Sequence, residues 1–382
     1  MEMAGPLHGI KVLEFESIGP APFAGMLLAD MGADVLVIDR PGTTDLGVER
    51  ERWYDVMMRG KRSVSVDLKS SQAAGPVLDL MARADAVIEG MRPGVMERLG
   101  LGPDEALGRN PRIVYGRVTG WGQSGPLAAL AGHDINYIAL TGVLNAIGRH
   151  GGPPVPPLNL IADFGGGGML LALGVVCALI EVSRSGRGQV IDAAMVDGAS
   201  LLAAMFFGLL HANQIEEARG ANVLDTGAPW YNVYETKDGK YVSVGAIEAR
   251  FFDELARRLD LKGLAQHDRG RWPQMAQQFD TIFKSKTRDE WVQIFEGSDA
   301  CFAPVLGWSE APRHAHNRSR KAHVTVNRIE QPAPAPRFSR TPGEVLRPPP
   351  ERGEGGAEAL EDWGFGVDEI ERMKSRGFGF KS

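Results

Sequence analysis

The chain has 382 residues, with 42 basic and 48 acidic side chains and a formal net charge of −6. This length gives a prior of about two to three domains and can bury a core without disulfides. The acidic balance argues against a nucleic-acid or membrane-surface protein, although a local basic patch can still hold an anionic ligand. Glycine is in excess, with 48 residues, so it must serve local purposes in a globular chain.

The two cysteines exclude a disulfide framework and a cysteine-rich zinc site. Cys177 and Cys301 lie in apolar stretches, which predicts small buried side chains. The N-terminal sequence MEMAGPLHGI lacks the basic and apolar regions of a secretory signal. The apolar stretch 164–180 is shorter than the ~20 residues of a bilayer span. We therefore expect a buried helix there, a cytoplasmic protein and no membrane partner.

The first half of the chain alternates short β-prone stretches with helical ones. Strands are predicted at 11–15, 34–39, 64–67, 86–89 and 113–118. Helices are predicted at 22–31 and 70–84, where prolines and a serine mark helix starts. This alternation is typical of βαβ units, so it predicts a parallel sheet whose strand ends form ligand sites.

The remainder is mainly helical. We expect helices at 133–148, 163–183 and 196–212, with a strand at 189–193. Residues 231–235 and 240–244 flank the turn Lys237-Asp238-Gly239 and predict a hairpin. Further helices are expected at 248–261, 275–284, 288–295 and 367–374. The proline-rich segment 332–350 predicts an extended crossing.

Two glycine motifs require explanation. Residues 120–125 (GWGQSG) match G-x-G-x-x-G after a strand, but Pro126 follows directly and no acid lies about 20 residues on, which disfavours a dinucleotide site. The run Gly165 to Gly168 lies between Asp163 and an apolar helix. It indicates either close approach of a backbone or ligand at a helix start, or close helix packing, and both alternatives remain open.

Ionisable residues begin two of the predicted helices. His133 and Asp134 begin one, in the sequence AGHDINY, and Asp163 begins the next. A histidine at a helix N-terminus is disfavoured in its protonated form, which suits a base. If the two helix starts point at one place, a histidine and a carboxylate flank a substrate. The alternative is a partly exposed capping pair.

Over residues from about 6 to 340, the sequence resembles the racemases of the family III CoA-transferase superfamily. The stretches that carry the resemblance occur in order along the chain. They are ADMGADVLVIDRPG, RGKRSVSVDLK, EGMRPGVMERLGLGP, RVTGWGQSGP, AGHDINYIALTGVL, PLNLIADFGGGG, GQVIDAAMVDG, RGANVLDTGAPWYNVYETKDGKYVSVGAIE, SDACFAPV and APAPRFSRT.

The resemblance implies an α/β fold, in which a Rossmann-like large domain with a parallel sheet is joined by long linkers to a smaller α+β domain. It also implies an interlocked homodimer. The corresponding boundaries are a large domain at 1–188 completed by 335–382, a linker helix at 189–227, a small domain at 228–308 and a return linker at 309–334.

The activity that the resemblance implies is interconversion of (2R)- and (2S)-2-methylacyl-CoA. Two bases transfer the α-proton through an enolate. His133 is expected to be the base for the S-isomer and Asp163 for the R-isomer, and the backbone N–H of Asp134 to hold the enolate oxygen. Glu248 is expected to orient the histidine, and Asn159 to support the site. The reaction implies no metal or redox cofactor, since CoA is part of the substrate.

The resemblance also implies a set of CoA and acyl contacts. The expected CoA-binding residues are Arg40, Val66, Asp67, Leu68, Lys69, Gly90, Met91, Arg92 and Arg98, with the basic residues Arg59, Lys61 and Arg62 expected near the same ligand. Around the thioester we expect Gly132, Ile135, Asn136 and Tyr137. Candidates for the acyl surface are Met195, Leu224 and Tyr231.

Some features depart from the racemase pattern. Thr226 stands where racemases read glycine in DGGAP, and Phe302 and Ala303 replace VT in SDACVTPV. Both changes fall in the stretches next to the acyl site, so the natural substrate stays open. One alternative is a CoA-transferase in which Asp163 is a covalent nucleophile. Another is a non-catalytic acyl-CoA-binding protein, which has no need of the residues His133, Asp163 and Glu248.

Overall fold

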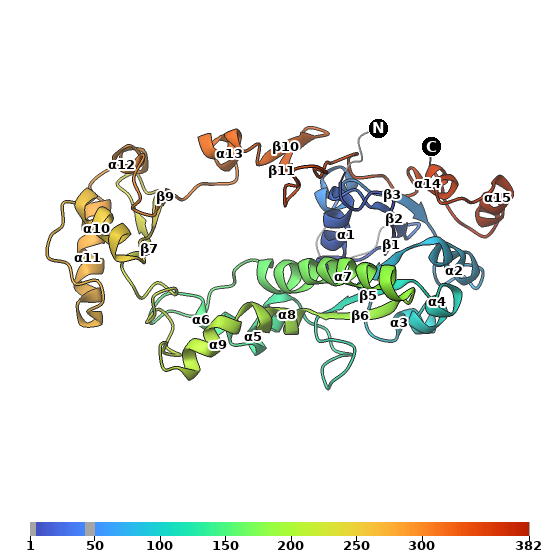
Figure 1. The fold of residues 1–382 in the computed structure, drawn as a ribbon, viewed down its shortest axis with the longest axis horizontal. Coiled ribbons are helices and arrows are strands. Elements are labelled where there is room, and N and C mark those ends of the chain that lie inside the picture. Colours follow the sequence, from blue (N-terminus) through green and yellow to red (C-terminus); the bar gives the residue numbers. More distant parts are fainter. Residues whose placement is uncertain (1–4, 43–49, 382) are drawn as a thin grey trace. The chain divides into compact units, whose positions relative to one another are not determined.

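The computed structural model describes residues 5–42 and 50–381. Residues 1–4, part of the N-terminal stretch behind the cytoplasmic prediction, lie outside this description. By internal contacts the chain divides into two compact units (Figure 1). Unit 1 contains residues up to 141, 158–202 and those from 320 on, and unit 2 contains 142–157 and 203–319. The domain boundaries expected from the sequence stay a prediction.

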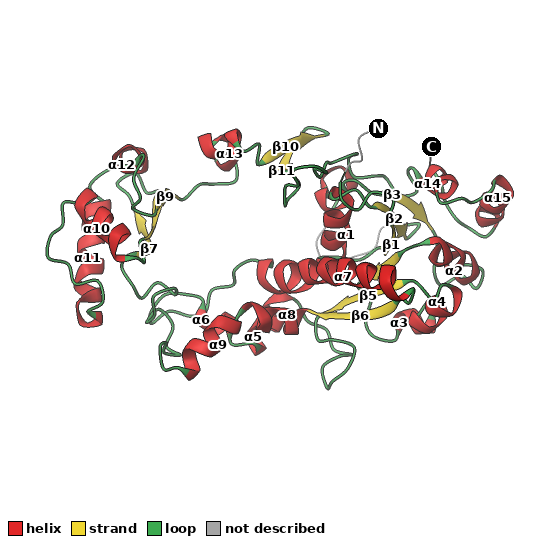
Figure 2. Cartoon of the chain, viewed as in Figure 1, coloured by secondary structure: helices red, strands yellow, loops and turns green. Residues whose placement is uncertain are grey.

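Unit 1 is built on a six-stranded parallel sheet in the order β3-β2-β1-β4-β5-β6. Strands of this sheet are drawn in yellow in Figure 2. The strands are β1 (Lys11–Phe15), β2 (Asp34–Asp39), β3 (Arg62–Ser65), β4 (Ala86–Glu89), β5 (Val114–Thr119) and β6 (Gln189–Ala194). The predicted parallel sheet is confirmed. Its order reverses between β1 and β4, and in such sheets ligands bind outside the carboxyl ends of the strands at that point.

Helices flank the sheet of unit 1. They are α1 (Pro20–Asp30), α2 (Ala74–Arg83), α3 (Val95–Arg98), α4 (Pro103–Arg109), α5 (Asp134–Leu140), the π-helix η3 (Leu160–Met169), α7 (Leu170–Ser185), α8 (Met195–Leu202), α14 (Gly356–Asp362) and α15 (Val367–Ser375), with the short 3₁₀ helices η1 (Arg52–Tyr54) and η2 (Val56–Met58). An antiparallel hairpin, β10 (His323–Val326) and β11 (Ile329–Pro332), interrupts the region expected to be a plain return linker.

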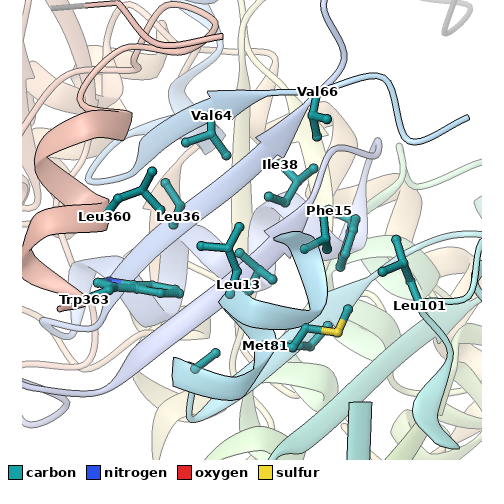
Figure 3. Close-up of a cluster of buried hydrophobic side chains, with 14 of the residues drawn as sticks. Leu13, Phe15, Leu36, Ile38, Val64, Val66, Met81, Leu101, Leu360 and Trp363 are labelled. Atoms are coloured by element: carbon teal, nitrogen blue, oxygen red, sulfur yellow. The ribbon is translucent and has the colours of Figure 1, made fainter. Parts of the chain in front are cut away.

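The C-terminal segment completes the core of unit 1. Alternate residues of β1 and β2, such as Leu13 and Leu36, face a cluster that includes Leu360 and Trp363 (Figure 3). The same cluster contains Phe378 near the end of the chain. Backbone hydrogen bonds add to this packing, since the N–H of Ser63 donates to Glu354 at 2.9 Å. Residues beyond Arg340, which the resemblance left unmatched, are therefore structural.

The predicted helix 163–183 is part of a longer helix that begins as a π-helix. Its glycines lie against other backbones: a Cβ built at Gly198 of α8 would be 1.9 Å from the carbonyl oxygen of Gly166. A Cβ at Gly167 would be 2.8 Å from the Met195 side chain, and one at Gly168 would be 2.7 Å from Phe23. The π-helix therefore packs closely against both α1 and α8, and this packing explains the glycine run. Of the two alternatives, a ligand at the helix start and close helix packing, the second accounts for the glycines.

Two expectations from the sequence, the length of this apolar helix and the burial of the two cysteines, are wrong. The helix spans Leu160–Ser185, 26 residues with a mean hydropathy of 1.9, and is long and apolar enough to cross a membrane. The sequence limits of 164–180 were too narrow, because the π-helix extends the helix towards its N-terminus. In its most apolar stretch of 18 residues, 44% is buried. The helix packs on β5 and β6. Cys177 and Cys301 are both exposed, not buried.

Unit 2 has an antiparallel sheet in the order β7-β8-β9. Its strands are β7 (Tyr231–Glu235), β8 (Tyr241–Gly245) and β9 (Phe302–Pro304), and its helices are α6 (Val143–Ala146), α9 (Ala204–His211), α10 (Ala249–Arg258), η4 (Arg269–Arg271), α11 (Trp272–Phe283), α12 (Arg288–Phe295), η5 (Ala311–Arg313) and α13 (Ala315–Ser319). The hairpin prediction is confirmed. The predicted helix 196–212 is two helices, α8 in unit 1 and α9 in unit 2.

Candidate active site

His133 begins α5 as its N-cap residue. Its backbone is extended, its N–H donates to the Asn136 side-chain oxygen at 3.0 Å, and its carbonyl accepts the Asn136 N–H at 2.8 Å. These bonds satisfy groups that a helix start leaves unpaired. The His133 side chain is exposed in this chain, as are Ile135 and Asn136. The imidazole is therefore held at a helix start with access to a ligand.

The next residue, Asp134, is buried and joins α5 to the π-helix. One carboxylate oxygen accepts the backbone N–H of Ala162 at 2.7 Å and that of Asp163 at 2.9 Å. These N–H groups lie in the first turn of the π-helix, where partners are missing and negative charge is favoured. The Asp134 side chain therefore fixes the backbone of Asp163 relative to His133. Sequence reasoning assigned this residue only a backbone role.

Asp163 is half-buried, and its carboxylate accepts a hydrogen bond from the Asn159 amide at 3.0 Å. Burial raises its pKa above the ordinary value. The Asn159 bond opposes that change, the neighbouring Asp134 adds to it, and the charge of His133 opposes it. His133 is therefore close enough to act electrostatically on Asp163. The structure brings together the two predicted bases and their predicted support.

Gly19 shapes the other side of the Asp163 carboxylate and was missed from the sequence. It follows β1 in a left-handed conformation, φ 71°, and a Cβ there would lie 3.3 Å from an Asp163 oxygen. Glycine adopts this conformation without strain. The sequence signal was its position directly before Pro20 at the start of α1. Asp163 therefore lies at the loop that follows β1, next to the point where the sheet order reverses.

Tyr137 packs beneath the His133 loop. Its hydroxyl donates to the carbonyl of Gly132, and its ring meets Trp121 edge-on at 4.8 Å. Burial and the charge of Asp163 raise the pKa of Tyr137 to about 12, while Arg92 acts in the opposite direction. A Cβ at Gly120 would overlap this ring at 2.1 Å, and one at Gly132 would lie 2.7 Å from it. These two glycines therefore make room for Tyr137.

The loop after β4 lies beside the loop after β1. A Cβ at Gly90 would be 3.2 Å from the Ser17 hydroxyl. Met91 follows, with its N–H donating to Glu89 at 2.5 Å, and Arg92 is exposed. Arg92 acts electrostatically on Tyr137, the residue packed beneath the His133 loop. Arg98, at the end of α3, is also exposed.

Five of the expected CoA-binding residues lie at the carboxyl ends of β2 and β3. Arg40 directly follows β2, and its N–H donates to Glu16 at 2.9 Å. Asp67, Leu68 and Lys69 form a turn after β3 in which the Lys69 N–H donates to Asp67 at 3.0 Å. Val66 is buried in the core, which leaves only its backbone for a ligand.

The assignment of Arg59, Lys61 and Arg62 to the CoA site is corrected. All three side chains are buried in ion pairs: Arg59 with Asp30 at 2.6 Å, Lys61 with Glu14 at 2.6 Å, and Arg62 with Asp34 at 2.5 Å. Arg59 also donates to Gln331 and to the carbonyl of Pro332. A phosphate would have to displace these partners. The three residues precede β3 or begin it, away from the carboxyl ends of the strands.

The remaining predicted residues are Met195 in unit 1 and three residues of unit 2. Met195 is buried against Gly167, which explains it as a packing residue. Glu248, the exposed N-cap residue of α10, and the partly exposed Leu224 and Tyr231 belong to unit 2. The expected contact between Glu248 and His133 stays a prediction.

Comparisons with known proteins agree with the fold. The chain is 45% identical to mouse alpha-methylacyl-CoA racemase over 97% of its own length and 96% of that protein. It is 44% identical to the human protein of the same name, over the same shares. The crystal structure of Rv3272 from Mycobacterium tuberculosis covers 93% of this chain and 99% of its own, with a TM-score of 0.77 and 29% identity.

A family model extends the comparison from single relatives to the whole fold. The model of CoA-transferase family III matches residues 7–355. This range includes the parallel sheet, both helix starts of the candidate site and all of unit 2. The chain belongs to CoA-transferase family III.

Proposed function

We propose that the protein is a 2-methylacyl-CoA racemase that interconverts the (2R)- and (2S)-thioesters. The observation that carries the proposal is the placement of His133 and Asp163 at two helix starts that one buried carboxylate, Asp134, ties together. Inversion at the carbon next to a thioester requires a base on each face. Similarity to the mouse and human racemases supports the same reaction.

In the proposed reaction, His133 removes the α-proton of the S-isomer and Asp163 that of the R-isomer. In each direction the other residue, in its protonated form, donates a proton to the opposite face of the enolate. Burial raises the pKa of Asp163, which makes its carboxylate a stronger base than an exposed aspartate. The backbone N–H of Asp134 stabilises the enolate oxygen as charge develops there.

The CoA portion is held by cationic side chains near the carboxyl ends of the strands. Arg92 and Arg98 are exposed after β4, and Arg40 follows β2. Guanidinium groups bind phosphates with two parallel hydrogen bonds. The reaction needs no metal or redox cofactor, because CoA belongs to the substrate. We further propose an interlocked homodimer in the cytoplasm that has neither a nucleic-acid nor a membrane partner.

The main alternative is a CoA-transferase, because the family is named for that activity. In such an enzyme Asp163 attacks the thioester and releases CoA as a thiolate. An assay in heavy water separates the two. A (2S)-2-methylacyl-CoA is incubated with enzyme and no acceptor acid, and α-deuterium and epimer ratio are followed by mass spectrometry and chiral separation.

The proposal predicts deuterium incorporation together with racemisation. Acyl transfer that appears only when a carboxylic acid is added, without exchange, supports the transferase. The variant His133→Ala should lose exchange from the S-isomer, whereas His8→Ala, at an exposed histidine of unit 1, should not. Undiminished exchange in His133→Ala overturns the assigned mechanism.

A further inference from the structure

The C-terminal segment places a guanidinium against the loop that carries Arg40. Arg352 donates to the carbonyl oxygen of Arg40 at 3.0 Å. It also donates to both carboxylate oxygens of Glu16, at 2.7 and 3.0 Å. The second of those oxygens accepts the backbone N–H of Arg40 at 2.9 Å. Arg352 and Glu16 together therefore hold both backbone polar groups of Arg40.

This arrangement belongs to a buried charge network at the carboxyl ends of β1 and β2. Its carboxylates are Glu16 and Asp39, and its cations are Arg52 and Arg352. Glu16 and Asp39 are buried, so each depends on the neighbouring cations for its charge. Burial raises the pKa of Glu16, but hydrogen bonds from Arg352 and the Arg40 N–H lower it overall. The carboxylate is thus kept ionised as an acceptor.

The network leaves Arg352 with a contact that Arg52 does not share. Arg52 pairs with Asp39 and lies 3.7 Å from Glu16, whereas Arg352 also donates to the Arg40 carbonyl. The position of Arg352 is itself fixed, because the next residue, Gly353, donates its N–H to the Ser63 hydroxyl at 2.8 Å. A conformation with φ 83° at Gly353 requires glycine. The segment is therefore anchored on β3 directly beside the Arg40 loop.

We infer that Arg352 is a positioning residue for the nucleotide end of the CoA site, acting through the backbone of Arg40. The inference rests on the proposed function, in which Arg40 helps to hold the CoA portion, and it assigns to Arg40 a phosphate at the nucleotide end. Arg352 itself does not touch the reacting atoms. Its loss should therefore weaken recognition of the nucleotide without changing proton transfer at the thioester.

The test compares two substrates in the full-length enzyme: a (2S)-2-methylacyl-CoA and the same acyl thioester of pantetheine, which lacks the nucleotide. For Arg352→Gln we expect KM for the CoA thioester to rise about tenfold, which corresponds to ~1.4 kcal/mol, with kcat changed less than twofold. With the pantetheine thioester, KM should equal that of the wild type. Arg352→Lys should fall between, because an ammonium cannot reproduce the forked geometry.

The matched control is Arg52→Gln, which removes a cation from the same network but no contact with Arg40. It should leave KM for the CoA thioester within twofold. Circular dichroism and calorimetric titration with free CoA show whether each variant is folded and how tightly it binds. Equal KM effects on both substrates, equal effects of the two variants, or no effect on CoA binding each overturn the inference. A wild-type enzyme that exchanges no α-proton with either substrate overturns the proposed function instead.

Discussion

Two groups of basic residues, beside strands β3 and β4 of one sheet, have opposite roles. Arg59 and Lys61 precede β3, and their side chains are buried in ion pairs with Asp30 and Glu14. Arg92 and Arg98 follow β4 and are exposed. In a parallel sheet, ligands bind at the carboxyl ends of the strands. The position of a cation before or after its strand therefore separates structural charges from candidate ligand-binding ones.

The buried basic residues have a structural role, because their charges are paired inside the fold. Glu14 and Lys61 are both fully buried, and burial raises the pKa of Glu14 and lowers that of Lys61. Gly25 of α1 leaves the space that they occupy, since a Cβ there would lie 1.8 Å from a Glu14 oxygen. The basic side chains next to β3 are therefore buried in ion pairs inside the fold. Those that follow β4 are exposed.

The largest expected effect is at the candidate active site, at Asp163. Asp163→Asn should lower the rate of α-proton exchange from the (2R)-isomer by about 10²–10⁴, the usual contribution of a general base. A raised pKa means that this carboxyl stabilises the fold most below its unfolded pKa, and that this contribution is lost as pH rises through the folded pKa. Asp163→Asn should therefore melt no lower than the wild type at pH 8. Lower stability together with full activity contradicts the assignment.

The next effect concerns the buried pair. Lys61→Met leaves the Glu14 carboxylate buried without its partner, so the free energy of unfolding should fall by about 3–5 kcal/mol. Urea unfolding followed by circular dichroism measures it. The double variant Glu14→Gln, Lys61→Met should recover part of the loss. The comparison fails if Lys61→Met is as stable as the wild type but has a raised KM for the CoA thioester.

A smaller change is expected at the packing that supports Asp163. Gly198→Ala places a Cβ against the Gly166 backbone, 1.9 Å from its carbonyl oxygen. Overpacking of this kind costs about 1–3 kcal/mol, measured as a lower urea midpoint. Gly208→Ala is the control: that helical glycine of α9 has open space around its Cβ position, so alanine there should be neutral or stabilising. Similar losses in both variants argue against close packing as the cause.

The smallest effect is expected at Arg92. Arg92→Gln should raise KM for the CoA thioester about tenfold, the loss of ~1.4 kcal/mol of binding, while the urea midpoint stays unchanged. Arg184→Gln, at an exposed arginine of α7, should change neither. If Arg92→Gln destabilises the fold without affecting KM, the two groups of cations do not differ in the way described here.

The strand positions, and the place of His133 and Asp163 at two helix starts, could be predicted because they depend on local sequence; the roles of the two residues as bases stay a prediction. Alternation of β-prone and helical stretches predicts the parallel sheet, and ionisable residues at helix starts predict His133 and Asp163. The partners of Arg59 and Lys61 could not be predicted, since Glu14 and Asp30 are distant in sequence and are brought near only by the fold. The π-helix was missed because the reason for its glycine run, close packing against α1 and α8, exists only in the folded chain. The segment after Arg340 carries no local signal of the network that it completes.

That last segment also determines when the protein can fold during synthesis. The cluster that contains Leu13 also contains Leu360 and Phe378, and the whole of residues 203–319 is translated between them. A nascent chain therefore carries the early strands with an incomplete core until residues 360–378 have emerged. The core of unit 2, by contrast, uses residues 228–302 in one stretch. Unit 2 can therefore fold first, whereas the core of unit 1 is complete only after residues 360–378 have been synthesised.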